Sequence, residues 1–158
     1  MAGLAGGRER IEGMEKIAVK LLREGAHMPT YGTAEAAGAD LYACLEEAVT
    51  ILPGQTVAIP TGIALEVPKG CAGLVFARSS MGVKRDLAPA NKVGVIDSDY
   101  RGEILVMLHN HGSQERRIEP GERVAQLLIT PVFTPGFRQS EELSDTERGM
   151  GGFGSTGR

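Results

Sequence analysis

The sequence predicts an all-β protein built as a sandwich or a barrel. Its 158 residues include 22 glycines and 8 prolines, and both residue types favour turns over long regular elements. Pro-Gly and Pro-Lys-Gly sequences recur along the chain and separate short runs of alternating apolar and polar residues. Short alternating runs divided by turn signals are typical of antiparallel sheets. A chain of this length is expected to form one domain with a real core.

The individual strands are predicted from this alternation. Ile17, Val19 and Leu21 alternate with charged or small residues, which indicates a half-buried strand. The same pattern, bounded by turn residues, predicts further strands at residues 39–45, 56–59, 63–67, 74–76, 104–108 and 124–132. Only residues 80–85 have the composition of a helix, and that helix is expected to be short.

The two ends of the chain lack any apolar periodicity. Residues 1–14 are rich in glycine and charge, and we expect them to form a disordered N-terminal extension. The β domain is predicted to span residues 15–136. Residues 137–158 are polar and rich in glycine, and are predicted to form a flexible C-terminal arm.

Composition argues against several classes of function. The net charge of −3 and the absence of tryptophan disfavour a nucleic-acid binder. No apolar run approaches the roughly 20 residues needed to cross a membrane. Cys44 and Cys71 match no zinc-binding spacing, and no secretory leader precedes them. We therefore expect reduced thiols and a cytoplasmic location.

Residues 94–102, GVIDSDYRG, are the most informative stretch. They place two carboxylates, a hydroxyl, a phenol and a guanidinium between two glycines, directly after an apolar pair. Such a corner at the end of a strand suits a general base and a substrate contact. A solvated hairpin tip is the alternative, because aspartate, serine and glycine are ordinary turn residues.

Three other segments carry polar groups next to apolar runs. Arg78, Ser79 and Ser80 follow an apolar run and suit an oxyanion, although a serine N-cap would have the same composition. Asn91 precedes a turn that could form a hairpin, and its amide suits a base edge. Gln126 lies inside an apolar strand, so it needs a structural or substrate partner if it is buried.

The tail segment 148–157, RGMGGFGSTG, combines groups that can close over a phosphorylated aromatic ligand. Its glycines let backbone N–H groups approach phosphate oxygens, and its arginine and hydroxyls are donors. It is not a Walker A loop, because no lysine follows the glycines. A flexible glycine tail is the alternative. His109 and His111 have no third ligand at metal-site spacing, so we interpret them as strand-end and turn residues.

Five segments, in this order, resemble the five motifs of the trimeric deoxyuridine triphosphatases (dUTPases). They are residues 37–43 (AGADLYA), 78–80, 94–102, 121–127 (GERVAQL) and 148–157. The resemblance covers nearly the whole chain from Lys16, and its third and fifth motifs are highly specific.

The resemblance implies a jelly-roll-like β fold and a homotrimer whose three active sites are each built from all three subunits. In that family, the C-terminal arm of one subunit closes over a site formed by the other two. The implied reaction is hydrolysis of dUTP to dUMP and pyrophosphate with Mg²⁺. This activity would keep uracil out of DNA and supply dUMP for thymidylate synthesis.

The resemblance also implies roles for individual residues. Asp97 matches the general base that activates water, and Tyr100 matches the residue stacked under the deoxyribose. Asn91 reads uracil together with the backbone of Gly94, Val95 and Ile96. Asp40 is expected to hold magnesium through water. The other matched residues contact phosphate or cover the base: Arg78, Ser79, Ser80, Gln126, Arg148, Phe153, Gly154, Ser155 and Thr156.

Ala77 departs from the pattern, because many family members have proline before the second-motif arginine. Asp99 is expected to have a structural role, pairing with an arginine. Two other functions remain open. A dCTP deaminase shares an Arg-Ser-Ser segment but would lack both the Asp-Tyr-Arg-Gly corner and the Gly-Phe-Gly-Ser-Thr arm. A non-catalytic nucleotide sensor would keep the pocket without the turnover.

Overall fold

The computed structural model describes residues 16–154, so the expectation for residues 1–14 lies outside the described part. Within that range the chain forms twelve strands and one helical turn. Their bounds are β1 Val19–Leu21, β2 Thr30–Tyr31, β3 Ala39–Tyr42, β4 Val49–Ile51, β5 Thr56–Pro60, β6 Ile63–Leu65, β7 Cys71–Phe76, α1 Ser79–Gly82, β8 Leu87–Pro89, β9 Gly94–Ile96, β10 Leu105–Asn110, β11 Arg116–Ile118 and β12 Arg123–Pro131.

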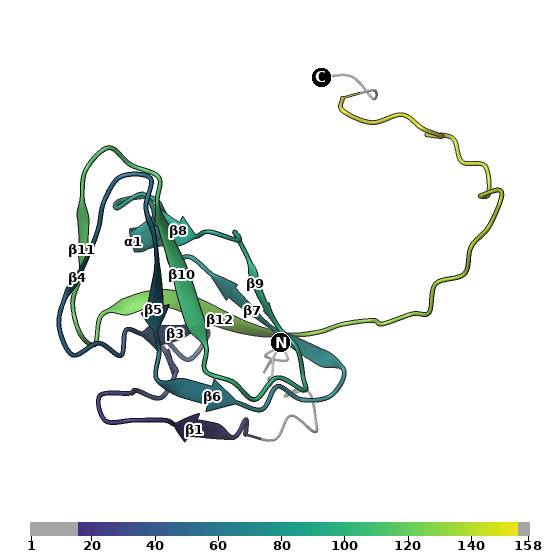
Figure 1. Ribbon diagram of the computed structural model, residues 1–158. Coiled ribbons are helices and arrows are strands. Elements are labelled where there is room, and N and C mark those ends of the chain that lie inside the picture. The colour runs from purple at the N-terminus through teal and green to yellow at the C-terminus, as the bar shows by residue number, and fades with distance from the viewer. Residues whose placement is uncertain (1–15, 155–158) are drawn as a thin grey trace, which may run out of the picture.

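All strand pairs are antiparallel, and the largest sheet has the order β2-β3-β12-β7-β9. A second sheet has the order β5-β10-β8, and the pairs β1-β6 and β11-β4 complete the body. Figure 1 shows the strands packed into one body, from which the chain after β12 leaves as a long arm. The predicted all-β, jelly-roll-like fold is therefore confirmed.

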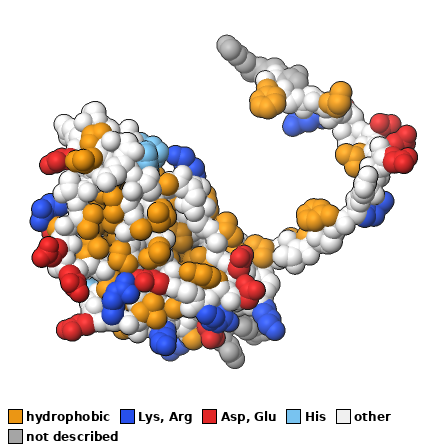
Figure 2. Space-filling model, viewed as in Figure 1, with side chains coloured by type: hydrophobic (Ala, Val, Ile, Leu, Met, Phe, Trp, Pro, Cys, Tyr) orange, Lys and Arg blue, Asp and Glu red, His pale blue; other side chains and the backbone are white. Residues whose placement is uncertain are grey.

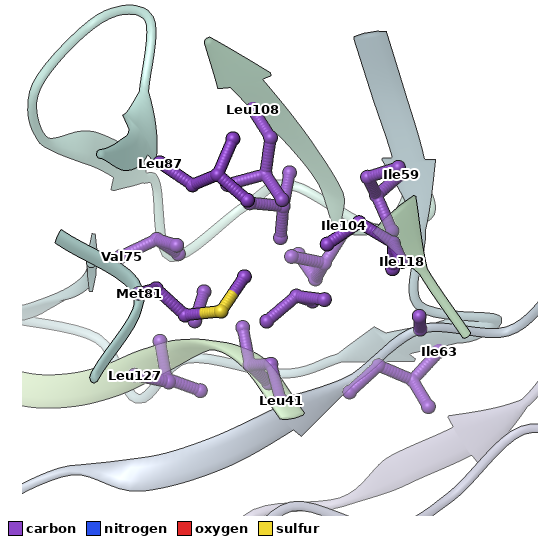
Figure 3. Close-up of a cluster of buried hydrophobic side chains, with 14 of the residues drawn as sticks. Leu41, Ile59, Ile63, Val75, Met81, Leu87, Ile104, Leu108, Ile118 and Leu127 are labelled. Atoms are coloured by element: carbon purple, nitrogen blue, oxygen red, sulfur yellow. The ribbon is translucent and has the colours of Figure 1, made fainter. Parts of the chain in front are cut away.

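One apolar core lies between the sheets. Figure 3 shows side chains from both sheets pointing toward one another, with Met81 of α1 among them. Met81 is only 2% exposed, so the single helical turn is held by the side chain that it buries. Leu108, Ile118 and Val124 are fully buried. Asn110 is buried too, and its amide is satisfied by the carbonyls of Ile51 and Gln114 and by the N–H of Gly112.

β12 lies between β3 and β7 in the largest sheet. A bulge in its pairing with β3 falls between Arg123 and Ala125. A bulge adds one residue to one strand and breaks the alternation of faces. This explains why Val124 and Ala125 are both buried although they are neighbours. The alternation resumes beyond them, so Gln126 points away from the core and Leu127 points into it.

The structure departs from the sequence-based expectations at several elements. The helix is one turn, Ser79–Gly82, earlier and shorter than expected, and Gly82 ends it. The strands β2, β4, β8 and β11 are too short to show a clear alternation in sequence. The Asn91 turn does not close a hairpin, because β8 pairs with β10 and β9 pairs with β7. No helix within residues 16–154 is long and apolar enough to cross a membrane.

Gly62, between β5 and β6, offers a test of the packing. Its φ is +70°, and an added Cβ would lie 2.7 Å from the Cys44 sulfur and 2.8 Å from the Ala26 Cβ. Gly54 has a φ of +74° but open space around it. Gly54→Ala is expected to lower the free energy of unfolding by about 1–2 kcal/mol through backbone strain alone. Gly62→Ala should lower it by about a further 1–3 kcal/mol through overpacking.

Urea unfolding of both variants checks this difference. Equal losses of stability in the two variants would mean that the loop around Gly62 moves away freely, against the close packing described.

Candidate active site

A pocket of about 250 Å³ lies between β9 and β10. It is lined by Val75 of β7, by the turn after β8, by β9 and the corner that follows it, and by residues 103–107. Six of the predicted site residues meet here: Asn91, Gly94, Val95, Ile96, Asp97 and Tyr100. The volume is just below the range of sites that enclose drug-sized ligands. It therefore suits a base with its sugar better than a whole nucleoside triphosphate.

The pocket exists because the chain changes sheets at this point. β8 pairs with only the last three residues of β10 and stops at Pro89. The chain then makes a tight turn, in which Lys92 has a φ of +65° and its N–H donates to the Pro89 carbonyl at 2.9 Å. It continues as β9 in the other sheet. The first half of β10 thus has no strand beside it on this side, and the pocket occupies that space.

β9 is the edge strand of its sheet. It pairs with β7 on one side, with Val75 opposite Gly94. An edge strand has a row of backbone N–H and C=O groups without sheet partners, and in β9 this row borders the pocket. Within residues 16–154, no strand pairs with β9 on this side, and Val95 is 64% exposed.

The corner after β9 is a tight turn from Asp97 to Tyr100, whose N–H donates to the Asp97 carbonyl at 3.2 Å. Arg101 holds the turn by donating to the carbonyls of Ser98 at 2.9 Å and Tyr100 at 3.0 Å. The Asp97 side chain is exposed at the pocket. Its carboxylate has no hydrogen-bond or ion-pair partner within residues 16–154, so its lone pairs are available to accept a proton.

Tyr100 folds back over Gly102. An added Cβ at Gly102 would lie 2.4 Å from the phenol oxygen and 2.6 Å from the ring. The phenol donates to the Glu103 carbonyl at 2.9 Å. Glycine at position 102 is therefore required for the ring to lie in this position beside the pocket.

A second group of predicted residues lies around the end of β7. Arg78 binds Asp40 through Nε–Oδ1 at 2.7 Å, and its Nη1 donates to the Ser80 hydroxyl at 3.2 Å. Arg123 reaches the other Asp40 oxygen at 3.2 Å. Gln126 donates to the Ala77 carbonyl at 2.9 Å. We call Asp40, Arg78, Ser80, Arg123 and Gln126 the basic cluster. Sequence reasoning assigned no role to Arg123, although this residue lies within the fourth motif.

Gly38 fits closely against this cluster. A Cβ there would lie 2.6 Å from Gln126 Oε1 and 3.2 Å from Gln126 Cβ. A larger residue would push the amide away from Ala77. Glycine at position 38 is therefore needed for the close packing of this segment against Gln126.

The pocket and the basic cluster lie at different places on one sheet. Asp40 is in register with Gln126, and Gln126 with Phe76. Val75, one residue earlier, lines the pocket opposite Gly94. Successive side chains of a strand point to opposite faces, so the row of Gln126 faces away from the row of Val75. No member of the basic cluster lines the pocket. The structure therefore does not bring all the predicted site residues together.

The arm is likewise separate from the pocket. After Pro131 the described chain has no helix or strand, and Figure 2 shows that the apolar side chains along most of this segment lie away from the body. Arg148 and Phe153 are exposed, and so is Gly154. Ser155 and Thr156 lie outside the described residues.

Two other expectations are corrected. The helix N-cap is Arg78 and no side chain caps it, so neither Ser79 nor Ser80 has the N-cap role considered from the sequence. Asp99 has no ion pair with an arginine inside the described range 16–154, because Arg101 contacts Glu66 at 3.6 Å and backbone carbonyls instead.

The two histidines lie at the end of β10. The Thr56 hydroxyl is 2.8 Å from His109 Nδ1, and Lys92 Nζ is 3.4 Å from His111 Nε2. Partial desolvation, then the charges of Lys92 and His109, lower the pKa of His111 below 6.5, against the pull of Asp86. These contacts place the histidines in a strand-end polar cluster.

The described residues do not form a metal cage. Residues 16–154 contain no group of three or more histidine, cysteine, aspartate or glutamate side chains placed to hold one ion. Asp40, the predicted magnesium residue, is 8% exposed and bound by two guanidinium groups. Direct coordination would have to break those ion pairs, so this carboxylate does not fit as a direct ligand.

Glu103 is a pocket residue that sequence reasoning missed. The bond to the Arg23 guanidinium lowers the pKa of Glu103 below its ordinary 4.5, opposed by desolvation and helped by the Gly62 N–H. A carboxyl with a lowered folded-state pKa stabilises the fold fully above its unfolded pKa, and this contribution is lost as the pH falls through the lowered value.

Glu103→Gln is therefore expected to lower the free energy of unfolding near neutral pH by up to about 1 kcal/mol, since Arg23 is well exposed. The difference from wild type should shrink on acidification below pH 4.5. Urea unfolding at neutral and at acidic pH measures it. A difference that is independent of pH would exclude an ionised Glu103 as the stabilising group.

The chain matches a known protein family over most of its length. The family model described as dUTPase matches residues 24–157. The chain belongs to the dUTPase family. It is therefore an enzyme-family member, as the sequence motifs predict, and its β fold is that of the family's solved structures.

Curated and solved relatives cover nearly all of the chain. The deoxyuridine 5'-triphosphate nucleotidohydrolase of Desulfitobacterium hafniense is 51% identical over 143 residues, which are 90% of this chain and 95% of that protein. The dUTPase of Staphylococcus bacteriophage 80alpha, solved with dUPNHPP, has a TM-score of 0.83 at 32% identity. The match covers 90% of this chain and 99% of that one.

A mutant of the dUTPase from phage phi11 of S. aureus, described with a structural Mg(II) ion, has a TM-score of 0.75 at 27% identity. The match covers 83% of this chain and all of that one.

Proposed function

We propose that the protein is a dUTP diphosphatase, which hydrolyses dUTP to dUMP and pyrophosphate. The observation that carries the proposal is the pocket of about 250 Å³ in which an unpartnered Asp97, Tyr100 and the free edge of β9 meet. Membership of the dUTPase family supports the substrate. The bound analogue in the phage 80alpha relative does so as well.

The base is read by the edge of β9 and by Asn91. Fixed backbone donors and acceptors match the carbonyls and N3–H of uracil and mismatch the amino group of cytosine. A mismatch of this kind leaves buried polar groups unpaired, and it discriminates by up to about 10⁴–10⁵-fold. The turn before β9 and the β9 edge are expected to exclude the methyl group of thymine.

The sugar lies against the ring of Tyr100. The ring is held over Gly102 by its bond to the Glu103 carbonyl. A ring fixed in this way occupies the space that a ribose 2′-hydroxyl would need, so deoxyribose is accepted and ribose is excluded.

Asp97 acts as the general base. Its carboxylate takes a proton from a water molecule, and the water oxygen attacks the α-phosphorus in line. The bond from the α-phosphorus to the oxygen that bridges to the β-phosphorus breaks, and pyrophosphate leaves. The reaction consumes one water and yields dUMP.

The active site is shared between subunits of a homotrimer. The pocket of about 250 Å³ is small for a whole triphosphate, and no member of the basic cluster of the same chain lines it. Two sites that are separate in one chain can combine when a second copy brings its basic cluster to the pocket. The arm, which packs on no part of its own body, supplies Arg148, Phe153, Gly154, Ser155 and Thr156 from a third copy.

The phosphates are bound by Arg78, Ser80 and Gln126 of the basic cluster, together with the neighbouring Ser79. Asp40 and its two arginines hold that arrangement in place. Magnesium belongs to the proposal as an ion bound mainly by the substrate phosphates, because magnesium usually keeps several waters. Asp40 would approach it only through water.

The proposed location is the cytoplasm, where the enzyme would keep uracil out of DNA and supply dUMP for thymidylate synthesis. Both cysteines are free thiols in the fold, which suits a reducing compartment.

The test is pyrophosphate release from dUTP, dCTP, dTTP and UTP with magnesium, with ammonia release from dCTP measured in parallel. Pyrophosphate from dUTP alone is the expected result. Ammonia from dCTP would replace the proposal with a deaminase, and binding of dUTP without any turnover would replace it with a nucleotide sensor.

A further inference from the structure

An ion pair joins the segment after β1 to the wall of the pocket. Arg23, two residues after β1, donates from Nη1 to Glu103 Oε2 at 3.2 Å and from Nη2 to Oε1. The two residues are 80 positions apart in sequence. The family match begins at residue 24, so Arg23 lies just before the part of the chain that the family model covers.

Glu103 is anchored at a second point. Its Oε1 accepts the Gly62 N–H at 2.8 Å. Gly62 is itself packed, because its α-carbon faces Cys44 and Ala26 at distances that leave no room for a Cβ. The Gly62 carbonyl accepts the N–H of Leu22 at 2.8 Å. The carboxylate is thus bound to a backbone that cannot shift easily.

The residues after Glu103 are also held. The Ile104 carbonyl accepts both the N–H of Thr61 at 3.2 Å and its hydroxyl at 2.6 Å, and the Ile104 N–H donates to the Ile63 carbonyl at 2.9 Å. The Glu103 carbonyl, between these anchors, is the acceptor of the Tyr100 phenol. Every contact that sets the position of this carbonyl therefore bears on the position of the Tyr100 ring.

We propose that Arg23 and Glu103 are positioning residues that hold Tyr100 against the sugar and thereby determine discrimination between deoxyribose and ribose. This inference rests on the proposed function, in which Tyr100 excludes the 2′-hydroxyl. Glu103 does not touch the reacting atoms. It fixes the backbone carbonyl that holds the phenol, and Arg23 fixes Glu103 from the side of β1.

Loss of this anchor is expected to affect binding of the sugar more than the chemical step. Without the anchor, the corner from Tyr100 to Glu103 moves more freely, and the ring withdraws from the sugar for part of the time. A ribose then fits more often and a deoxyribose is held less firmly. Asp97 directly follows β9, and its side chain has no hydrogen bond to Glu103. The KM for dUTP should rise while kcat changes little.

The measurement is the ratio of kcat/KM for UTP to kcat/KM for dUTP. A variant that is merely less stable has less active enzyme for both substrates, so its ratio does not change. Glu103→Ala should raise the ratio about five- to tenfold, the effect of losing roughly one hydrogen-bonded anchor. Arg23→Ala should raise it less, since the Gly62 bond remains. The double variant should not exceed Glu103→Ala, because both act through one contact.

Two further variants sharpen the result. Glu103→Gln can still accept the Gly62 N–H and should recover much of the discrimination that Glu103→Ala loses. Arg23→Ala carries the test if Glu103→Ala does not fold. Arg117→Ala is the matched control, because it breaks the exposed ion pair of Arg117 with Glu119, at 2.6 Å and outside the pocket lining.

The outcomes separate the two proposals. If the wild-type protein releases no pyrophosphate from dUTP, the proposed function fails and this inference fails with it. If wild type hydrolyses dUTP and the ratio is unchanged in Glu103→Ala, Glu103→Gln and Arg23→Ala, only the positioning role is overturned. A rise of equal size in Arg117→Ala would overturn it too, because the effect would then not depend on contact with the pocket.

Discussion

Asp97→Asn is expected to lower kcat for dUTP about 10²–10⁴-fold, the contribution of a positioned general base. The substitution keeps the size and planarity of the side chain but removes its ability to take a proton from water. Asp97 lines the pocket at its exposed side, so its change should leave dUTP affinity nearly intact. Pyrophosphate release gives kcat, and calorimetric titration with a non-hydrolysable dUTP analogue gives the affinity.

Asp99→Asn is the matched control. It makes the same chemical change two residues later, at an exposed side chain that does not line the pocket. Its kcat should stay close to that of wild type. Near-normal turnover by Asp97→Asn, or an equal loss in both variants, would remove Asp97 from the role of base.

Deletion of residues 139–158 is expected to leave a folded trimer whose dUTP hydrolysis falls roughly 10²–10³-fold, as on removing a preorganised donor to developing charge. The described arm contains no strand or helix after Pro131. Phe137 and Leu143 are 98% and 89% exposed, so the body of the same chain does not depend on them. The arm is expected to supply ligand contacts and to exclude water from the site.

Circular dichroism and size-exclusion chromatography with light scattering report the fold and assembly of the truncated chain, and pyrophosphate release reports its activity. Arg148→Ala tests the arm within the full chain, with Glu147→Ala as the neighbouring control that removes a charge of the other sign. Arg148→Ala should reduce activity and Glu147→Ala should not. Loss of the trimer on truncation would mean that the arm holds the assembly together.

The sequence predicted the fold class because its signals are local. Glycine and proline act on their own backbone, and alternation within five or six residues decides which side chains face a core. The all-β class and the family are confirmed. The motif around Asp97 was found for the same reason, since its polar groups lie within nine consecutive residues, of which Asp97 and Tyr100 line one pocket.

Local sequence signals of this kind did not predict the contacts between segments that are distant in sequence. Nothing near Arg23 or Glu103 in sequence indicates that these residues meet across 80 positions. The Asn91 turn looks like a hairpin from its composition, but β8 and β9 pair with different strands. Asp40 carries a carboxylate, which is a typical magnesium ligand. In the fold, Arg123 of β12 and Arg78 after β7 both donate to this carboxylate.

The sequence by itself therefore determined the fold class, the family and the chemical groups of the site. The tertiary structure decided how those groups are divided, with the pocket at the sheet edge formed by β9 and the basic cluster around the paired residues Asp40 and Gln126, away from the pocket lining. The physical reason is the period of a strand. The alternation of a strand predicts that Val75 and Phe76 face opposite sides of the sheet. The residues that each side chain contacts are determined by the pairing of β7 with β9 and β12.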